Sequence, residues 1–411
     1  MSDERLAADL DFDDVPIFNP FDPVTHRDPY PAYHRLREHD PVHQPFPGVW
    51  ILTRYRDAAA LLRDPRGSSD RRKSEMYELF LQSLPEPLDP EELQPSMLFL
   101  DPPDHDRLRG LVHKAFTPRV VERLTERIEE VVAGLLDRVA DEREWDVVAD
   151  LAYPLPVTVI SDMLAVPEAD RDHLRRWSLD LIHTIDPIIP PDALARAQTA
   201  GREFRAYLND LIVDRRKRPG EDLLSGLIAA EDQGEQLSPA ELVSTCVLLL
   251  IAGHETTSGL IGNGTLALLR HPDEMRRLRE DPSLIRSGIE ELLRFDSPVQ
   301  LTGRLMLEDV EIGGRRIAKG EDVVAIVGAA NRDPGQFPDP DRLDLGRPEN
   351  RHMAFGGGIH FCLGAHLARL EGRVAIGELM RRFPTLDLAT DEVEWRDTIT
   401  LRGLKSLRVA A

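Results

Sequence analysis

Apolar residues recur at intervals of three and four through the middle of the chain, which is the pattern of amphipathic α-helices. This pattern predicts helices over residues 118–140, 167–185, 192–216 and 239–270, another over 283–295, one from 363 to just before Pro384, and short ones over 32–38 and 55–62. Short runs of β-type residues predict strands at 49–53, 301–307, 310–312 and 323–327. The chain is therefore predicted to be mainly α-helical with a small β region, an α+β protein.

Three segments lack a regular pattern. Residues 1–28 are acidic and contain several prolines, which predicts an extended lead-in. Residues 67–103 are interrupted by prolines, and a loop of that length inside a compact chain is usually functional or disordered. A meander rich in proline, glycine and aspartate is predicted over 331–349. Because there is no internal repeat and no low-complexity linker, we expect a single domain over residues 29–411.

The composition excludes several classes of protein. Among 411 residues, 73 are acidic and 51 are lysine or arginine, so the net charge of -22 argues against a nucleic-acid partner. The two cysteines, Cys246 and Cys362, exclude a disulfide framework and a zinc finger. The longest apolar stretch, residues 246–253, is too short to span a membrane, and the first residues lack a signal-peptide pattern. We therefore expect a cytoplasmic protein without a membrane span.

The segment 355–364, Phe-Gly-Gly-Gly-Ile-His-Phe-Cys-Leu-Gly, carries the most specific chemistry. Three glycines allow tight backbone angles directly before Cys362, which stands at the entrance of a predicted helix. There, free N–H groups and the positive end of the helix dipole are expected to lower the thiol pKa and favour a metal-binding thiolate. Gly364 leaves room for a flat ligand close to the backbone. The alternative is a structural cysteine in a glycine-rich turn, as we expect for Cys246 in an apolar helix.

The pattern Phe355-x-x-Gly358-x-x-x-Cys362-x-Gly364 resembles the haem-binding signature of the cytochrome P450 family, and the resemblance extends from about residue 20 to the C-terminus. It implies the cytochrome P450 fold in a single haem domain, with haem b as cofactor. It makes Cys362 the thiolate ligand of the iron, and Phe355 and Gly364 cofactor contacts. The implied function is a haem-thiolate monooxygenase that inserts one atom of O2 into an apolar small organic molecule, by hydroxylation or epoxidation.

Residues 252–257, Ala-Gly-His-Glu-Thr-Thr, interrupt an otherwise apolar helix with polar groups. An acid next to a hydroxyl can pass protons from solvent to a bound oxygen species. The segment resembles the acid–alcohol pair of the family, which implies that Glu255 delivers protons, that Thr256 holds and protonates the bound oxygen, and that Ala252 contacts the cofactor. The alternative is a threonine that bonds back to its own helix and a glutamate in a core salt bridge.

Haem propionates are anions and require cationic or hydrogen-bonding partners. His105 and Arg109, four residues apart on one helix face, resemble the segment that clamps a propionate in the family. Arg304 and His360 match two further contacts, although each of the four could instead be a solvated surface group.

Glu291 and Arg294 resemble the buried Glu-x-x-Arg pair of the family, which has a structural role. Its third member is usually another arginine, from the meander. We expect this to be Arg342, with Arg347 as the alternative.

The substrate pocket and the electron donor are less specific predictions. No reductase module is present in the sequence, so electrons are expected from a ferredoxin with its ferredoxin reductase. Because ferredoxins are usually acidic, docking would need a local basic patch, for which His113, Lys114, Arg369 and Arg373 are candidates. The cations of residues 71–73 are more simply a solvated loop tip. The predicted pocket residues are Met76, Phe80, Leu81, Met97, Leu98, Ile185, Ile189, Leu249, Val299, Leu301, Ile399 and Thr400.

Two other functions remain open from the sequence. A haem-thiolate sensor would bind ligands without turnover, but it has no need of a proton-delivering pair. A helical scaffold without haem would carry the cysteine loop by coincidence.

Overall fold

Helices form most of the described part of the chain, which in the computed structural model comprises residues 19, 22–89, 93–116, 118–187, 189–231, 237–390 and 392–411. The α-helices are α1 (Pro23–Arg27), α2 (Tyr30–His39), α3 (Tyr55–Leu61), α4 (Glu75–Ser83), α5 (Asp104–Ala115), α6 (Pro118–Arg123), α7 (Thr125–Arg138), α8 (Pro154–Met163), α9 (Arg171–Leu181), α10 (Pro191–Lys217), α11 (Leu223–Glu231), α12 (Pro239–Arg270), α13 (Pro272–Glu280), α14 (Ile285–Phe295), α15 (Val327–Asn331) and α16 (Ala365–Arg382). Short 3₁₀ or π turns are η1 (Arg71–Lys73), η2 (Met97–Phe99), η3 (Val148–Ala152), η4 (Glu168–Asp170), η5 (Ile182–Ile185), η6 (Pro282–Leu284) and η7 (Gly358–His360).

The strands form one larger sheet and three small ones. They are β1 (Val42–Phe46), β2 (Val49–Leu52), β3 (Gly67–Ser68), β4 (Glu144–Asp146), β5 (Leu301–Met306), β6 (Val310–Ile312), β7 (Arg315–Ile317), β8 (Asp322–Ile326), β9 (Asp387–Leu388), β10 (Glu394–Trp395), β11 (Leu404–Ser406) and β12 (Arg408–Ala410). The larger sheet has the order β1-β2-β8-β5-β3, in which β2 and β8 are parallel and the other neighbours antiparallel. The small sheets are β4-β12-β9, β10-β11 and β6-β7.

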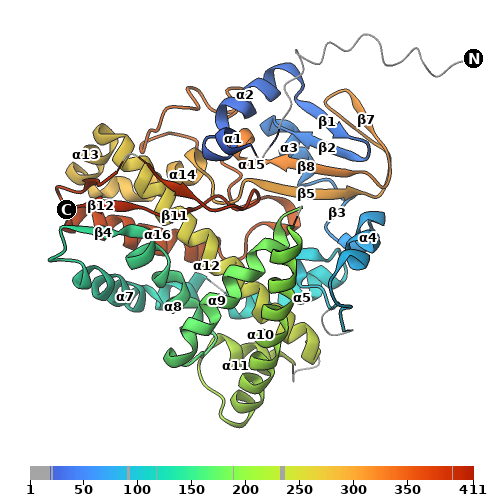
Figure 1. Ribbon diagram of the computed structural model, residues 1–411, viewed down its shortest axis with the longest axis horizontal. Coiled ribbons are helices and arrows are strands. Elements are labelled where there is room, and N and C mark those ends of the chain that lie inside the picture. Colours follow the sequence, from blue (N-terminus) through green and yellow to red (C-terminus); the bar gives the residue numbers. More distant parts are fainter. Residues whose placement is uncertain are drawn as a thin grey trace, which may run out of the picture.

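The two kinds of structure occupy different sides of the molecule. The larger sheet lies on one side with α2 and α3 beside it, and helices α7 to α11 lie on the other side (Figure 1). One apolar core joins the helices, and a second lies between the larger sheet and α3. The predicted α+β class is confirmed, because a small sheet region is attached to a mainly helical body.

Helix α12 is the central element of the helical body. It begins with a capping box, in which Ser238 and Glu241 each bond the backbone N–H of the other, a strong start signal. The helix is long and apolar enough to cross a membrane, but 67% of its most apolar 18-residue window is buried inside the protein. That burial is typical of a core helix, and it also stabilises the helix where Gly262 and Gly264 would weaken it.

Most predicted elements are confirmed, but several predicted bounds are wrong, and three segments differ most clearly. The predicted lead-in over 1–28 contains α1, because Asp22 caps the helix and proline fits its first turn; residues 1–18, 20 and 21 of that prediction lie outside the described part. The segment 67–103 contains α4, since its prolines begin only after Ser83, and also β3, η1 and η2. The predicted helix 118–140 is divided into α6 and α7 at Leu124.

Candidate functional site

The loop before Cys362 adopts a conformation that depends on its glycines. Gly356 and Gly358 have φ of +70° and +66°, in the left-handed region that favours glycine. A Cβ on Gly358 would also overlap the carbonyl oxygen of Leu62, so no other residue fits there without movement. The amide of Cys362 donates to the carbonyl of Phe355 (2.9 Å), which closes the loop directly before α16. The sequence therefore places a cysteine at the start of a helix on a loop of fixed shape.

The electrostatics of Cys362 differ from the sequence prediction. Burial raises the pKa of the thiol above its usual value, and this outweighs the opposing effects of the N–H groups of Gly364 and Ala365 and of the Arg109 and Arg369 cations. The predicted lowering of the Cys362 pKa is therefore wrong for the protein alone. The helix start and the arginines act in the predicted direction, but a thiolate here needs a further positive charge, such as a metal ion.

Several polar side chains gather beside the cysteine loop, of which His105 is buried and Arg109 and His360 are half-buried. His105 is 1% exposed, its Nδ1 lies 2.9 Å from Asp106, and its Nε2 has no partner among the described residues. The rings of His105 and His360 lie 4.3 Å apart, centroid to centroid. The guanidinium of Arg109 donates to the carbonyl of Phe361. The structure thus brings three of the four predicted propionate ligands together around the loop.

Arg304, the fourth predicted ligand, lies close enough to His360 for its positive charge to affect that imidazole. It is 8% exposed and donates to the carbonyl of Gly303 (2.7 Å), and within the described ranges no carboxylate forms an ion pair with it. Burial lowers the pKa of Arg304. Burial also lowers the pKa of His360 to about 3, and the Arg304 cation adds to this effect.

This group of donors fits the anionic edge of a haem. Buried cations are normally paired, so an unpaired arginine beside an imidazole nitrogen that has no partner and can donate when it carries a proton indicates that anions bind there. The two propionates of a haem would be such anions. On the backbone side, a Cβ built on Gly364 would meet no atom within 4 Å, which leaves open space next to the cysteine. His105, Arg109 and Arg304 can donate to anions, and Cys362 offers a thiol beside the open space at Gly364, an arrangement that fits haem b.

Helix α12 contains an opening in the middle of its buried length. Ala252 is exposed and Thr256 is half-buried, although His254 and Glu255 between them are buried. Residues 252 and 256 are one turn apart and share a face, so that face borders a space that protein atoms do not fill. The Thr256 hydroxyl donates to the Ala252 carbonyl (2.7 Å), which orients its oxygen lone pairs away from the helix backbone.

Glu255 directly precedes Thr256 in α12, and a cation from a distant segment holds its carboxylate. Its carboxylate oxygens lie 3.2 and 3.3 Å from the guanidinium of Arg396. Burial raises the pKa of Glu255, and Arg396 acts in the opposite direction. Both contacts that the sequence left open as structural alternatives therefore occur: a threonine bonded to its own helix and a glutamate in a buried ion pair.

The predicted structural pair is buried as expected, but its third member is Arg347. Glu291 and Arg294 are both fully buried and form a two-point ion pair with distances of 2.7 and 2.8 Å. Arg347 Nε lies 3.1 Å from both Glu291 oxygens. The prediction of Arg342 is wrong, because Arg342 contributes its backbone carbonyl, which accepts from Arg294 and Arg347, while its side chain is exposed.

The predicted pocket residues differ in their burial. Met97 and Leu249 are buried in the main core, and Leu98 is 39% exposed. The side chain of Met76 lies outside the described part of the structure. The half-buried remainder consists of Phe80, Leu81, Ile185, Ile189, Val299, Leu301, Ile399 and Thr400. Direct contacts join two of the predicted walls: the hydroxyl of Thr400 donates to the carbonyl of Ile185 (3.3 Å).

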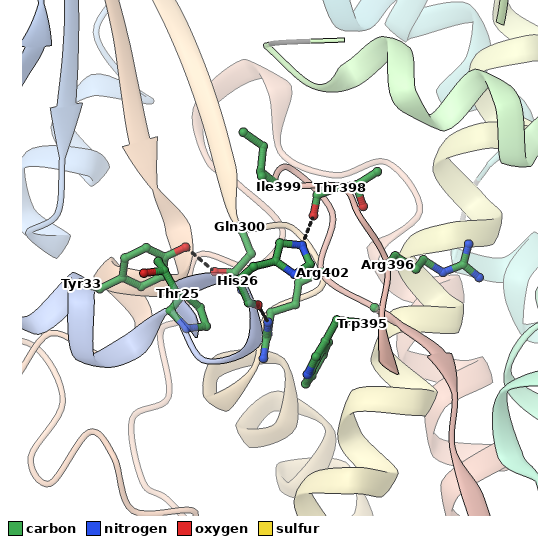
Figure 2. Close-up of a pocket in the computed structure, with 11 residues that line it drawn as sticks. Thr25, His26, Tyr33, Gln300, Trp395, Arg396, Thr398, Ile399 and Arg402 are labelled. Carbon is green, nitrogen blue, oxygen red and sulfur yellow. Dashed lines mark hydrogen bonds between the residues drawn. The ribbon is translucent and has the colours of Figure 1, made fainter. Parts of the chain in front are cut away.

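A separate pocket lies between α1 and the loop that connects β10 to β11. Figure 2 shows Thr25, His26, Tyr33 and Gln300 on one side of it and Thr398, Ile399 and Arg402 on the other. Of the predicted substrate residues only Ile399 belongs to its lining. No residue of the 355–364 loop is among them.

Arg396, which pairs with a residue 141 positions earlier in the chain, is not marked by any signal in the sequence. A second missed group is Glu371 on α16, a carboxyl that is 1% exposed and lies against Thr257 of α12. Neither residue belongs to a recognisable local motif, so only the packing of distant segments reveals them.

Comparison with known proteins gives full-length similarities. The sequence model of the family described as Cytochrome P450 matches residues 86–399. Polyketide biosynthesis cytochrome P450 PksS of Bacillus subtilis (strain 168) is 41% identical over 405 residues, covering 96% of this chain and 98% of that protein. Cytochrome P450 monooxygenase PikC of Streptomyces venezuelae is 43% identical over 394 residues, covering 93% and 91%. The ligand-free crystal structure of Mycobacterium smegmatis CYP164A2 has a TM-score of 0.89 and 44% identity, covering 95% and 98%.

Proposed function

The chain belongs to the cytochrome P450 family of haem-containing monooxygenases, and from this premise we propose that it inserts one atom of O2 into an apolar small organic molecule, by hydroxylation or epoxidation. Members of this family bind haem b through a cysteine thiolate. We assign Cys362 as that ligand and His105, Arg109, Arg304 and His360 as the partners of the propionates. The unpaired buried donors around the cysteine loop support this assignment.

When bound, the haem activates O2, and a thiolate ligand favours cleavage of the O–O bond. The chain's own residues supply protons and exclude solvent. Glu255 takes a proton from water and passes it to the oxygen of Thr256, whose hydroxyl releases its own proton into the opening in α12. Ala252 leaves space beside the hydroxyl, since a larger side chain would fill the opening. The observation that carries the proposal is this acid–hydroxyl pair at an opening in a buried helix.

Replacement of Thr256 by alanine tests the proton role directly. We expect Thr256→Ala to keep its haem but to divert electrons from product into peroxide. Thr265→Ala is the matched control, because Thr265 lies on the same helix, is fully buried and has a hydroxyl without a partner in the described structure. If Thr256→Ala forms as much product per electron as the control, Thr256 has no part in proton transfer. A sensor, by contrast, would show ligand-linked spectral changes and no product with any electron donor.

The substrate is proposed to be apolar because the half-buried residues of the predicted walls are mainly aliphatic. Relatives with names such as vitamin D(3) 25-hydroxylase and 6-deoxyerythronolide B hydroxylase are 45% and 42% identical to this chain, which favours a sizeable substrate. A spectral titration against a library of such compounds, following displacement of water from the iron, would identify the class. Binding only of small polar compounds would contradict the proposal.

Electrons are proposed to come from a ferredoxin and its reductase, which dock near the cysteine loop. His113 and Lys114 are exposed at the end of α5, and Ile359 and Phe361 of the loop itself are 49% and 43% exposed. Exposed apolar residues next to cations are typical of a docking site for an acidic protein. Arg369 is paired with Glu290 (2.6 Å), so Arg373 is the better candidate on α16, and Lys114 is the exposed cation at the end of α5.

Charge reversal tests this surface. We expect Lys114→Glu and Arg373→Glu to slow reduction by a ferredoxin and to weaken its dependence on salt. An unchanged rate and salt dependence would show that the donor docks elsewhere. A cytoplasmic location is part of the proposal, since the ferredoxin system would have to be present in the same compartment.

A further inference from the structure

Arg396 connects the C-terminal hairpin to the acid of α12. It directly follows β10, and its amide donates to the carbonyl of Gly403 (2.9 Å), just before β11. The base of this hairpin is fixed on α12: Gly403 approaches the Cα of Gly259, with a Cβ built on Gly403 lying 3.8 Å from it, and the Asn263 side chain donates to the carbonyl of Arg402 (3.0 Å). The backbone that carries Arg396 therefore has a fixed position relative to Glu255.

The guanidinium of Arg396 points to Glu255 and away from the pocket that its backbone borders. Figure 2 shows the side chain directed away from the other labelled residues. One guanidinium nitrogen lies 3.2 and 3.3 Å from the two Glu255 oxygens. The side chain of Glu255 is 2% exposed and that of Arg396 is 16% exposed, so the arginine is the partner nearer to solvent. A pair of opposite charges at this depth interacts strongly because water screens it little.

The other polar groups around Glu255 leave Arg396 as its counter-ion. His254 Nδ1 lies 3.7 Å from Glu255 and 2.9 Å from the hydroxyl of Ser178 on α9. Burial lowers the pKa of His254 to about 3, so this imidazole is neutral. Burial raises the pKa of Tyr153, which is therefore also neutral, and its ring lies 4.1 Å from that of His254. The remaining cation nearby, Arg175, stacks over the Tyr153 ring at 4.7 Å.

We propose that Arg396 is the positioning residue of the proton relay: it holds the Glu255 carboxylate beside Thr256 and sets the pH range over which the relay works. The inference rests on the proposed role of Glu255 in proton delivery. A carboxylate that is fixed by an ion pair keeps one orientation and regains its charge after each proton transfer. Without Arg396, the buried carboxyl would be free to turn and would hold its proton to higher pH.

Infrared spectroscopy of the resting holoenzyme measures this effect without turnover. The band of the protonated Glu255 carboxyl is identified as the one that Glu255→Gln removes. We expect Arg396→Met to raise the midpoint of its titration by about 1 to 3 pH units, the usual effect of removing an adjacent opposite charge. Arg396→Lys should keep the midpoint near the wild-type value. Lys405→Met is the matched control, since Lys405 is a cation of the same hairpin that pairs only with the exposed Asp397 (2.9 Å) among the described residues. Equal midpoints in wild type and Arg396→Met would overturn the inference.

The pH dependence of product formed per electron provides the second measurement. In Arg396→Met, the pH above which the yield of product per electron falls, its high-pH limit, should rise together with the infrared midpoint. A purely structural role would lower the yield equally at every pH and leave this limit in place. Glu255→Gln separates the two proposals. If Glu255→Gln forms as much product per electron as wild type at every pH, Glu255 does not deliver protons. If Glu255→Gln forms less product per electron but Arg396→Met shifts neither the high-pH limit of that yield nor the infrared midpoint, only the role of Arg396 is wrong.

Discussion

Glu371 on α16 is a buried acid whose titration should be visible in the stability of the protein. Its side chain is 1% exposed, and its Oε1 has no hydrogen-bond partner in the described part of the chain. Burial raises its pKa from 4.5 to about 8, and a hydrogen bond with Thr257 acts in the opposite direction. At neutral pH the folded protein therefore keeps a proton on Glu371 that the unfolded chain has released.

The sign of the effect follows from proton binding. Between pH 4.5 and about 8 the folded state binds one proton more than the unfolded state, so the free energy of unfolding falls as pH rises. The slope is about 1.4 kcal/mol per pH unit, and over the whole interval the loss reaches about 5 kcal/mol. Glu371→Gln has nearly the same shape but no titrating proton, so it avoids this loss.

Chemical denaturation of the holoenzyme, followed at unit intervals from about pH 5 to about pH 9, measures the difference. We expect the stability of Glu371→Gln relative to wild type to increase steadily up to pH 8 and then to level off. Glu378→Gln on the same helix is the control. The Arg381 side chain lowers the pKa of Glu378, so that carboxyl stays ionised across this range and its removal should change stability by the same amount at each pH. A constant difference between Glu371→Gln and wild type would refute the reasoning, because it would mean that Glu371 is already ionised in the folded protein.

Two further predictions concern the scaffold of the site. Gly358→Ala should destabilise the protein by about 1 to 3 kcal/mol or more and impair haem retention, because the backbone has a positive φ there and the new Cβ would overlap the Leu62 carbonyl. Gly134→Ala, in an open helical position, is the control and should stabilise the protein by up to about 1 kcal/mol. Thermal melting combined with haem absorbance measures both effects. Arg347→Leu should cost about 3 to 5 kcal/mol in the same assay, since it removes one partner of a buried ion pair, and Arg342→Leu should cost little; equal losses would contradict the assignment of Arg347.

The sequence predicted the local elements of this protein better than the contacts between them. Helix α12 is predicted at residues 239–270, because thirty-two residues of helical periodicity leave little ambiguity. Helix α1 is not predicted, because several prolines favour an extended chain, although proline is compatible with the first turn of a helix.

The residues of the candidate site show the same difference between local motifs and contacts of distant segments. Cys362 and its glycines form a contiguous motif, and their backbone geometry is as the motif requires. The choice between Arg342 and Arg347 could not be made from sequence, because it depends on how an irregular meander folds over α14. Arg396 has no local signal at all, since its partner Glu255 is supplied by another segment. The predicted pKa of Cys362 was wrong because sequence shows the helix start but not the depth of burial.

The absorption spectrum of the reduced, carbon-monoxide-bound protein tests the central claim most directly. The claim is that Cys362, and not Cys246, supplies a thiolate to a haem iron. Cys246 is fully buried, burial raises its pKa to about 12, and it is therefore the natural control. We predict the red-shifted Soret band of a thiolate-ligated haem in wild type and in Cys246→Ser, and its loss in Cys362→Ser. Persistence of that band in Cys362→Ser, or its absence from the haem-loaded wild type, would contradict the account.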